Sequence, residues 1–327
     1  MAVISVPPRP YDTTAVRPGW ADLPAELRAA ISARLGSRVN WAGTAGGGFT
    51  RGFAGVLQTV AGDRVFVKAA SLVDQRHLSD WYAREVAVTA ALPAGLAVAR
   101  PRWTLTAGGY YAVCLDAIEG RMPGLPWSRA DLEATLGAYA TVADALREPP
   151  VELVALGTPR LADLVRADLA WWGELAAGRE TLPNPPAVAR HRLPDLAALE
   201  ARLPGYAEST SMIHGDLRVD NVLIDATGAA WLCDWTWLCL GPAWFDLAGL
   251  LVTAYASGLP ADDLFAAHPA ARNAPDDGLD AALAALAGYW LVRAAAGPST
   301  GSPHIRGHQQ WSGEIALSWL AARQGWQ

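Results

Sequence analysis

Three oxygen-bearing side chains, those of Asp216, Asn221 and Asp234, are spaced so that one hairpin would bring them together. Two short apolar runs, residues 222–224 and 230–233, flank an Asp-x-x-Gly turn, a pattern typical of a β-hairpin. Because a hairpin brings its outer ends together, Asn221 is expected to lie close to Asp234. Carboxylate and amide oxygens suit a hard divalent cation that also binds substrate phosphates. We therefore predict that Asn221 and Asp234 hold Mg²⁺.

Asp216 lies in the loop that leads into the hairpin and need not be a metal ligand. A carboxylate at this position can accept the proton of an incoming hydroxyl or orient that hydroxyl. His214 is expected to orient the loop through hydrogen bonds, because no second His or Cys stands at metal-ligand spacing. The order His-x-Asp-x-x-x-x-Asn, followed by a hairpin and an Asp, is the catalytic arrangement of protein kinases and their relatives.

The same segment resembles the aminoglycoside phosphotransferase family of small-molecule kinases. Members carry His-Gly-Asp-Leu, then Asn, then an Asp-Trp pair, and this chain has residues 214–217, Asn221 and Asp234-Trp235. A further family Asp, inside an Asp-Leu-Ala run, is matched by Asp246, which is expected to brace the catalytic loop. The resemblance implies ATP and Mg²⁺ as cofactors and transfer of the γ-phosphate to a hydroxyl of a small molecule.

A glycine-rich segment, residues 43–52, precedes two predicted strands at 55–60 and 64–69. Glycines let backbone N–H groups approach phosphate oxygens, and a lysine supplies a point charge to the same phosphates. Lys68 is the only lysine of the chain and lies in an apolar strand, although a solvated edge-strand lysine has the same pattern. Arg51 replaces the third glycine of the protein-kinase spacing, which leaves open which amides contact phosphate. The candidates are Gly47, Gly48, Phe49 and Thr50.

The resemblance implies further nucleotide contacts. Glu85, in a predicted helix seventeen residues after Lys68, is expected to pair with the lysine and hold it on the phosphates. A pair with Arg84 or a solvated position is the alternative. Asp116 and Ala117 follow an aromatic and apolar strand and correspond to the hinge, where backbone groups would contact the adenine edge.

Arg218, two residues after Asp216, stands where protein kinases place a lysine near the transferred group. It is expected to stabilise the developing charge, and an ordinary ion pair with Asp220 is the competing interpretation. An ATP-binding pseudokinase that acts as a scaffold or regulator is the alternative function. Such proteins usually lack the lysine, the catalytic aspartate or the metal aspartate, and all three are present here. A metal-dependent hydrolase using His214 and Asp216 would lack further ligands.

Composition restricts the class of protein further. The 327 residues suffice for two lobes, and 52% hydrophobic and 18% charged residues are typical of a compact chain. A net charge of −6 without a basic run argues against nucleic-acid binding. We find no secretory signal and no run near the about 20 apolar residues of a membrane span. Three cysteines without metal-type spacing favour reduced thiols. We expect a cytoplasmic protein with no membrane partner, either a monomer or a homodimer.

Strands precede helices along the chain, which predicts an α+β, two-lobe protein-kinase-like fold with a cleft between the lobes. A small N-terminal lobe would hold an antiparallel sheet plus one helix, and the larger C-terminal lobe would be mainly helical. The expected divisions are a proline-rich extended arm at 1–22, a nucleotide-lid lobe at 23–115, a hinge at 116–120 and a catalytic and substrate-binding lobe at 121–327. Helices are expected at about 24–35, 79–92, 128–147, 159–178, 195–203, 242–256, 260–267, 279–296 and 311–323.

The sequence does not identify the hydroxyl acceptor, for which the resemblance implies an antibiotic or other natural product, a sugar, a nucleoside or an amino alcohol. A polycationic aminoglycoside requires several carboxylates, and each candidate also suits a solvated surface position: Asp163, Asp168, Glu174, Asp276, Asp277 and Glu314. A partly apolar acceptor, such as a nucleoside, macrolide or glycoside, is favoured at least equally, because five tryptophans could stack on a ring: Trp171, Trp172, Trp237, Trp290 and Trp311.

Overall fold

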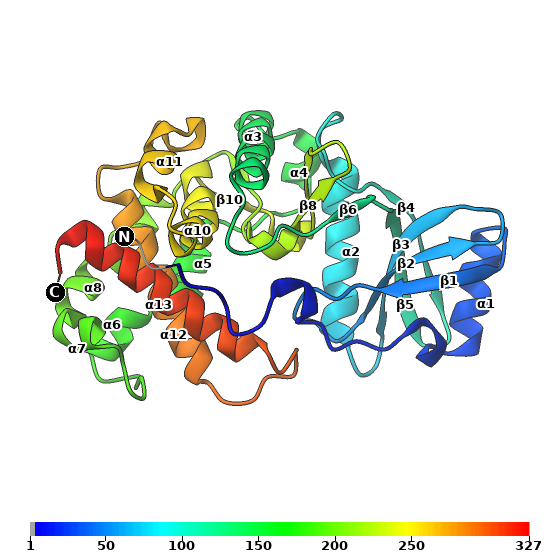
Figure 1. Cartoon of the computed structure of the whole chain (residues 1–327), viewed down its shortest axis with the longest axis horizontal. Coiled ribbons are helices and arrows are strands. Elements are labelled where there is room, and N and C mark those ends of the chain that lie inside the picture. Colours follow the sequence, from blue (N-terminus) through cyan, green and yellow to red (C-terminus); the bar gives the residue numbers. More distant parts are fainter. Residues whose placement is uncertain (1–3, 327) are drawn as a thin grey trace.

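Five strands of the N-terminal half form one antiparallel sheet in the order β1-β2-β3-β5-β4. The structure, a computed structural model, describes residues 4–326. Figure 1 shows the sheet and its helices at one end of the molecule and a larger helical lobe at the other. The strands are β1 Val39–Thr44, β2 Phe53–Thr59, β3 Arg64–Ser71, β4 Pro101–Ala107 and β5 Tyr110–Asp116. The predicted two-lobe kinase-like α+β fold is confirmed.

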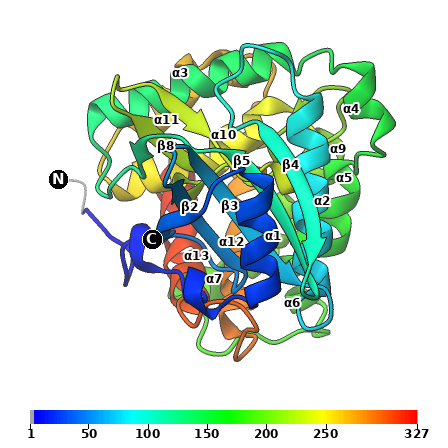
Figure 2. The same ribbon diagram turned by 90° about the vertical axis from the view of Figure 1, so that its right-hand side faces the viewer.

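Each face of this sheet is covered by a helix. On one face, α1 (Ala25–Arg34) buries Leu27 and Ile31 against Leu57 and Val67. In Figure 2 the sheet lobe faces the viewer with α1 in front. On the other face, α2 (Arg76–Ala91) buries an apolar cluster with β3 and β5. Successive side chains of β3 point to opposite faces, so Val67 is buried in the cluster under α1, whereas Phe66 and Lys68 lie half-buried on the opposite face.

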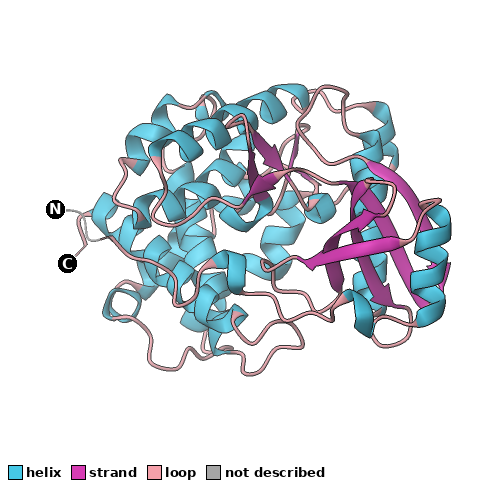
Figure 3. Cartoon of the chain, turned by 45° about the vertical axis from the view of Figure 1, so that its right-hand side comes forward, coloured by secondary structure: helices cyan, strands magenta, loops and turns pink. Residues whose placement is uncertain are grey.

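The second lobe is mainly helical, as Figure 3 shows by colour. Its core contains α12, whose residues from Gly278 to Gly288 are all buried and which packs along α13. The α-helices are α3 Arg129–Ala145, α4 Val151–Ala155, α5 Leu161–Leu164, α6 Trp171–Ala176, α7 Ala187–His191, α8 Leu193–Glu200, α9 Leu203–Tyr206, α10 Ala243–Ala256, α11 Ala261–Ala267, α12 Gly278–Ala295 and α13 Ile305–Gln324. Short helical turns lie at η1 Tyr11–Thr13, η2 Trp20–Asp22, η3 Val165–Leu169, η4 Val219–Asn221, η5 Trp235–Trp237 and η6 Pro269–Ala271.

The predicted hairpin of the helical lobe is present. Strands β8 (Val222–Asp225) and β9 (Ala230–Leu232) pair in antiparallel register, with Val222 opposite Leu232. β6 (Gly120–Arg121) adds a third strand, and β7 (Met212–Ile213) pairs with β10 (Cys239–Leu240) just beside it. These short pairings hold the segments before and after the hairpin in fixed positions.

Several predicted elements differ in extent. The helix expected at 159–178 is divided into α5, a π-helical turn and α6. The carboxylate of buried Glu200 accepts the backbone N–H groups of residues 171–173, so a new helix begins there. Helix α2 begins at Arg76 and α13 at Ile305, both earlier than expected. Strands β1 and β4 were not predicted, although residues 101–107 of β4 alternate between apolar and polar types; α4 and α7 were also missed.

The N-terminal segment connects the two lobes. Residues 1–3 of the predicted arm lie outside the described residues, and residues 4–19 cross from the helical lobe to the sheet lobe (dark blue in Figure 1). Near its start, the N–H of Ser5 donates to the carbonyl of Ala256, and Nε1 of Trp311 donates to Oγ of Ser5. Among residues 4–326, no helix has the length and apolarity that crossing a membrane requires.

Candidate functional site

The loop before the hairpin is held by two buried side chains. Asp246, in the first turn of α10, accepts hydrogen bonds from the backbone N–H groups of His214 (2.7 Å) and Gly215 (3.0 Å). Nδ1 of His214 accepts the N–H of Asp216, so the proton of the neutral ring lies on Nε2, which donates to the carbonyl of Cys233 (2.9 Å). Burial lowers the pKa of His214 to about 4, which keeps the ring neutral. Both ring nitrogens are therefore used to hold the loop against the outgoing end of the hairpin.

Gly215 occupies a position that excludes any side chain. Its φ is +80°, and a Cβ there would lie 2.2 Å from the carbonyl oxygen of Trp237. Gly228, in the hairpin turn, has a similar φ of +85° with no atom within 4 Å of a Cβ. We expect Gly228→Ala to lower the free energy of unfolding by about 1–2 kcal/mol, the cost of a left-handed backbone, and Gly215→Ala to lower it by clearly more. Urea denaturation of both variants measures the difference, and equal losses would contradict the steric explanation.

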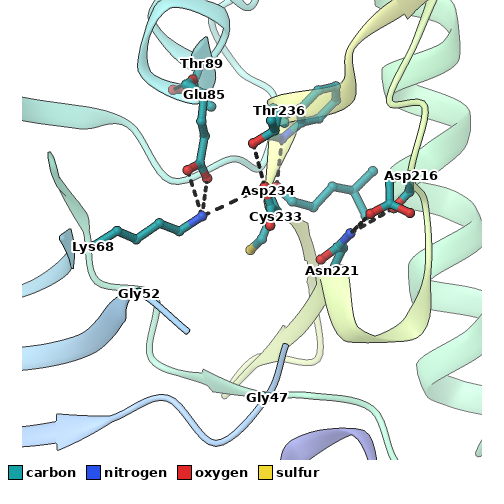
Figure 4. Close-up of polar contacts among 12 residues, drawn as sticks. Gly47, Gly52, Lys68, Glu85, Thr89, Asp216, Asn221, Cys233, Asp234 and Thr236 are labelled. Atoms are coloured by element: carbon teal, nitrogen blue, oxygen red, sulfur yellow. Dashed lines mark hydrogen bonds and ion pairs between the residues drawn. The ribbon is translucent and has the colours of Figure 1, made fainter. Parts of the chain in front are cut away.

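Asp216, Asn221 and Asp234 meet where the hairpin begins and ends (Figure 4). Nδ2 of Asn221 donates to the carbonyl oxygen of Asp216 (2.8 Å) and to its Oδ2 (3.3 Å), which leaves Oδ1 of Asn221 available for a cation. Asp234 has a left-handed backbone, with φ of 60°, which is uncommon for a residue other than glycine. Its Oδ1 accepts a hydrogen bond from Oγ1 of Thr236 (2.8 Å). Strained backbone of this kind is characteristic of functional sites.

Lys68 reaches this group from β3. Its Nζ lies 2.8 and 2.7 Å from the two carboxylate oxygens of Glu85 on α2, and 3.9 Å from Oδ1 of Asp234. Glu85 is only 2% exposed. Arg84, the alternative partner of Glu85, instead donates to the carbonyl of Leu156. The structure therefore brings the lysine, its glutamate and the hairpin aspartate together across the two lobes.

These groups line one cavity of about 880 Å³ between the lobes. The sheet lobe contributes Lys68 and all four glycine-loop candidates, residues 47–50. The helical lobe contributes Asp216, Asn221 and Asp234. Groups that are up to 187 positions apart in the sequence (47 to 234) thus line the same cavity.

The charges in the cavity act on one another. Burial raises the pKa of Asp216 to about 7, although the neighbouring Arg218 opposes this. Burial also acts to raise the pKa of Asp234, but Lys68 and the hydrogen bond from Thr236 outweigh it and the net shift is downward. For Lys68, burial acts to lower the pKa, and the negative charges of Asp234 and Glu85 raise it overall. Lys68 and Asp234 are therefore both charged near neutral pH.

Arg218 forms a two-point ion pair with buried Asp220: Nε lies 3.1 Å from Oδ1, and Nη2 lies 3.0 Å from Oδ2. Its Nε also lies 3.5 Å from Oδ1 of Asp216, and its guanidinium stands 5.7 Å from the centre of the Phe49 ring. The competing interpretation, a pair with Asp220, thus describes this geometry. The same side chain nevertheless borders the carboxylate of Asp216 on the cavity wall.

The glycine loop is tied to neighbouring segments. The N–H of Gly48 donates to Oγ1 of Thr14 (3.1 Å), and the carbonyl of Phe49 accepts the N–H of Ser302 (2.7 Å). A Cβ on Gly46 would lie 2.2 Å from the carbonyl oxygen of Asp12. Gly46 therefore lets the N-terminal arm approach the loop closely.

At the predicted hinge, Asp116 and Ala117 differ in position. Asp116 lines the cavity and Ala117 does not, whereas Ile118 does. The backbone N–H of Asp116 already donates to the carbonyl of Arg100 (2.9 Å), and its carboxylate pairs with Arg102. The N–H of Asp116 is therefore not available to an adenine edge.

The donor set around Asn221 and Asp234 fits Mg²⁺ that shares its coordination with phosphates. Among residues 4–326, no cluster of three or more His, Cys, Asp or Glu side chains could hold a metal by itself. One amide oxygen and one carboxylate are the partial set with which proteins hold Mg²⁺ beside substrate phosphates.

The predicted acceptor-binding residues lie largely elsewhere. Of the five tryptophans, Trp237 lines the cavity, whereas Trp172 and Trp311 are buried in the core. None of the six candidate acids lines the cavity, and four of them pair with arginines instead: Asp163, Asp168, Glu174 and Asp277. These acids therefore form no acceptor pocket in this cavity, and the alternative interpretation, solvated surface charges, describes them.

Sequence analysis missed several cavity residues. Asp12 and Arg17 come from the N-terminal arm, Thr236 follows Asp234 directly, and Tyr289 lies on α12. Residues 299–301 also line the cavity, from the connection between α12 and α13. Only Thr236 had a local indication, its position beside the metal candidate. The others depend on how distant segments pack.

The sequence matches the model of the phosphotransferase enzyme family over residues 56–286, well over half of the chain. The chain therefore belongs to this family, and the predicted resemblance to aminoglycoside phosphotransferases is confirmed. It is a phosphotransferase of the small-molecule kinase type. No curated protein sequence matches it significantly.

Solved structures share the fold at low sequence identity. A macrolide 2'-phosphotransferase type I is 20% identical with a TM-score of 0.52, each chain being covered to 90%. Spectinomycin phosphotransferase, in complex with ADP and spectinomycin, is 12% identical with a TM-score of 0.57, covering 89% of this chain and 97% of its own. A choline kinase from Streptococcus pneumoniae is 15% identical with a TM-score of 0.53, covering 90% and 98%.

Proposed function

We propose that this protein is an ATP-dependent kinase that transfers the γ-phosphate to a hydroxyl of a small, partly apolar molecule with little positive charge. The observation that carries the proposal is the convergence of Lys68, Asp216, Asn221 and Asp234 on one cavity between the lobes. Two structural neighbours hold adenine nucleotides: spectinomycin phosphotransferase is in complex with ADP, and a choline kinase is in complex with AMP. These complexes support ATP as the phosphate donor.

Each side chain has a role in positioning or charge neutralisation, which dominate phosphoryl transfer. Lys68, oriented by Glu85, would contact the phosphates from the sheet lobe, together with the loop at 47–50. Asn221 and Asp234 would hold Mg²⁺ from the opposite side. When bound, Mg²⁺ would supply positive charge to the phosphate oxygens. The carbonyl of Asp116 would accept a hydrogen bond from the adenine edge.

Asp216 would act on the acceptor. Its carboxylate borders the cavity, and Asn221 fixes its backbone and one of its oxygens by hydrogen bonds. It would orient the acceptor hydroxyl and accept its proton as the phosphate is transferred. Arg218, 3.5 Å from Asp216, would stabilise negative charge on the transferred group while it keeps its ion pair with Asp220.

An uncharged part of the cavity wall supports the proposed acceptor class. The residues that α12, α13 and their connection contribute carry no charge: Tyr289, Ser299, Thr300, Gly301 and Ile305. Phe49 and Trp237 add aromatic surface. Such a wall binds rings and hydroxyl groups better than several ammonium groups. A macrolide, nucleoside or other glycoside fits this description, and a polycationic aminoglycoside does not.

A panel of acceptors tests the proposal. ADP release would be measured with ATP and Mg²⁺ in the presence of a macrolide, a nucleoside, a neutral glycoside, choline and an aminoglycoside. We expect release with at least one neutral or singly charged hydroxyl compound, and loss of that release when EDTA removes Mg²⁺. Preference for the aminoglycoside would contradict the acceptor class. Absence of both ATP binding and ADP release with every compound would contradict the kinase function itself.

A further inference from the structure

The N-terminal arm places an arginine inside the nucleotide cavity. Arg17 lines the same cavity as Lys68 and Asp234, although it precedes the sheet lobe in sequence. Its Nη2 donates to the carbonyl of Gly47 (2.8 Å), and its Nη1 lies 3.4 Å from the carbonyl of Gly52. The guanidinium therefore lies directly against the glycine loop that covers the cavity.

This guanidinium has no carboxylate partner among the described residues. No Asp or Glu oxygen of residues 4–326 lies within 4.0 Å of it, in contrast to Arg218 and Lys68, which are both paired. Its Nε is shielded from solvent and makes no hydrogen bond within that part of the chain. A shielded charge without a counterion is costly unless a ligand supplies one, because guanidinium stays protonated. An anion is the missing partner.

The guanidinium of Arg17 lies near the proposed phosphate-binding part of the cavity. Burial lowers the pKa of Arg17, and Tyr82 and Asp234 oppose that shift, which places the guanidinium within electrostatic reach of Asp234. Arg17 thus lies against the glycine loop, in the cavity that the candidate Mg²⁺ ligand also lines. In a kinase site this is the space through which the phosphate chain of a nucleotide runs.

The arm is attached firmly enough to hold Arg17 in place. Oγ1 of Thr14 accepts the N–H of Gly48 (3.1 Å), and the N–H of Ala15 donates to the carbonyl of Gly46 (2.8 Å). Oγ of Ser302 donates to the carbonyl of Thr14 (2.6 Å), which ties the same turn to the helical lobe. Because Thr14 occupies the N–H of Gly48, this amide is not available to a phosphate, and the loop lacks one donor.

We propose that Arg17 is a phosphate-binding residue of the nucleotide site, supplied by the N-terminal arm in place of a glycine-loop amide. The guanidinium N–H groups that the glycine loop does not use would contact oxygens of the β- and γ-phosphates, opposite Lys68. The assignment rests on the proposed use of ATP. Arg17 would be a nucleotide-binding residue outside residues 56–286, the part of the chain that the family model matches.

Calorimetric titration with ATP, ADP and adenosine, in Mg²⁺-containing buffer, tests this assignment on the full-length protein. We expect Arg17→Ala to weaken ATP binding by about tenfold to a hundredfold, the worth of charge-assisted hydrogen bonds. ADP binding should weaken less, and adenosine binding should not change. Arg17→Gln, which keeps an amide donor for Gly47, should lose a similar share of ATP affinity, so the result does not depend on the alanine variant alone. Arg9→Ala is the control. Arg9 lies on the same arm and is exposed. Within residues 4–326, its side chain hydrogen-bonds only to the carbonyl of Thr13.

Three results would overturn the assignment: unchanged ATP affinity in both Arg17 variants, equal weakening of adenosine and ATP, or tighter ATP binding, which would mean that Arg17 fills the phosphate space itself. A thermal unfolding midpoint within a few degrees of the wild type confirms that each variant is folded. If the wild-type protein and Arg9→Ala bind ATP and the Arg17 variants bind it equally well, only the Arg17 assignment is wrong. If the wild-type protein binds no ATP, the proposed function is wrong and the assignment is wrong with it.

Discussion

Asp216→Asn is expected to lower kcat by about a hundredfold to ten-thousandfold while ATP affinity stays nearly unchanged. The amide has the shape of the carboxylate but cannot accept the proton of the acceptor hydroxyl, and general-base catalysis contributes a factor of this size. ATP binding should depend on other groups, because the role proposed for Asp216 is to act on the acceptor hydroxyl. Steady-state kinetics with the acceptor found in the panel, together with calorimetric titration of ATP, measure the two quantities separately.

Asp225→Asn is the matched control for this prediction. Asp225 lies in the turn of the same hairpin, where its carboxylate accepts hydrogen bonds from Thr227 and Trp231, and it does not line the cavity. Its variant should retain kcat even if it is somewhat less stable. Full activity in Asp216→Asn, or a loss of the same size in both variants, would show that Asp216 does not act on the acceptor.

Lys68→Met is expected to remove nucleotide binding and also to lower the free energy of unfolding by about 3–5 kcal/mol, because it leaves the buried carboxylate of Glu85 unpaired. The double variant Lys68→Met, Glu85→Gln removes both charges of the pair. It should regain a large part of the stability and none of the ATP affinity. Urea denaturation and ATP titration of the single and double variants separate the structural role of the pair from its role in binding.

The single variant Glu85→Gln completes this cycle. Lys68 then keeps only Asp234, 3.9 Å away, as a charged neighbour, so its position on the phosphates becomes less defined. We expect weaker ATP binding than in the wild type but stronger binding than in either variant without the lysine. Recovery of ATP affinity in the double variant would contradict a direct contact between Lys68 and the nucleotide.

The sequence was sufficient to predict the groups whose positions depend on local structure. The hairpin at 222–232 follows from two apolar runs and a turn, and it alone brings Asn221 to Asp234. The pairing of Lys68 with Glu85 required a family resemblance as well, since the residues lie on a strand and a helix that meet only in the folded lobe. In both cases the distance between the partners is determined by one or two adjacent elements.

The remaining cavity wall could not be predicted, because long-range packing determines it. Arg17 enters the site only because its arm binds the glycine loop on one side and Ser302 on the other. Tyr289 and residues 299–301 belong to α12 and its connection, which are distant from the motif in sequence. No spacing rule relates these segments to Asp216. The acids considered for a cationic acceptor lie outside the cavity for the same reason, since the packing of distant segments decides which residues line it.

The solitary lysine of this chain makes the protein a spectroscopic reporter of its own cleft. Growth with ¹⁵N-labelled lysine would introduce one ammonium signal, from the group that bridges Glu85 and Asp234. A nucleotide entering between the lobes would change the surroundings of that nitrogen, whereas molecules that adhere to the outer surface would not. NMR titration could thus distinguish entry into the cleft from adsorption elsewhere, with no engineered label.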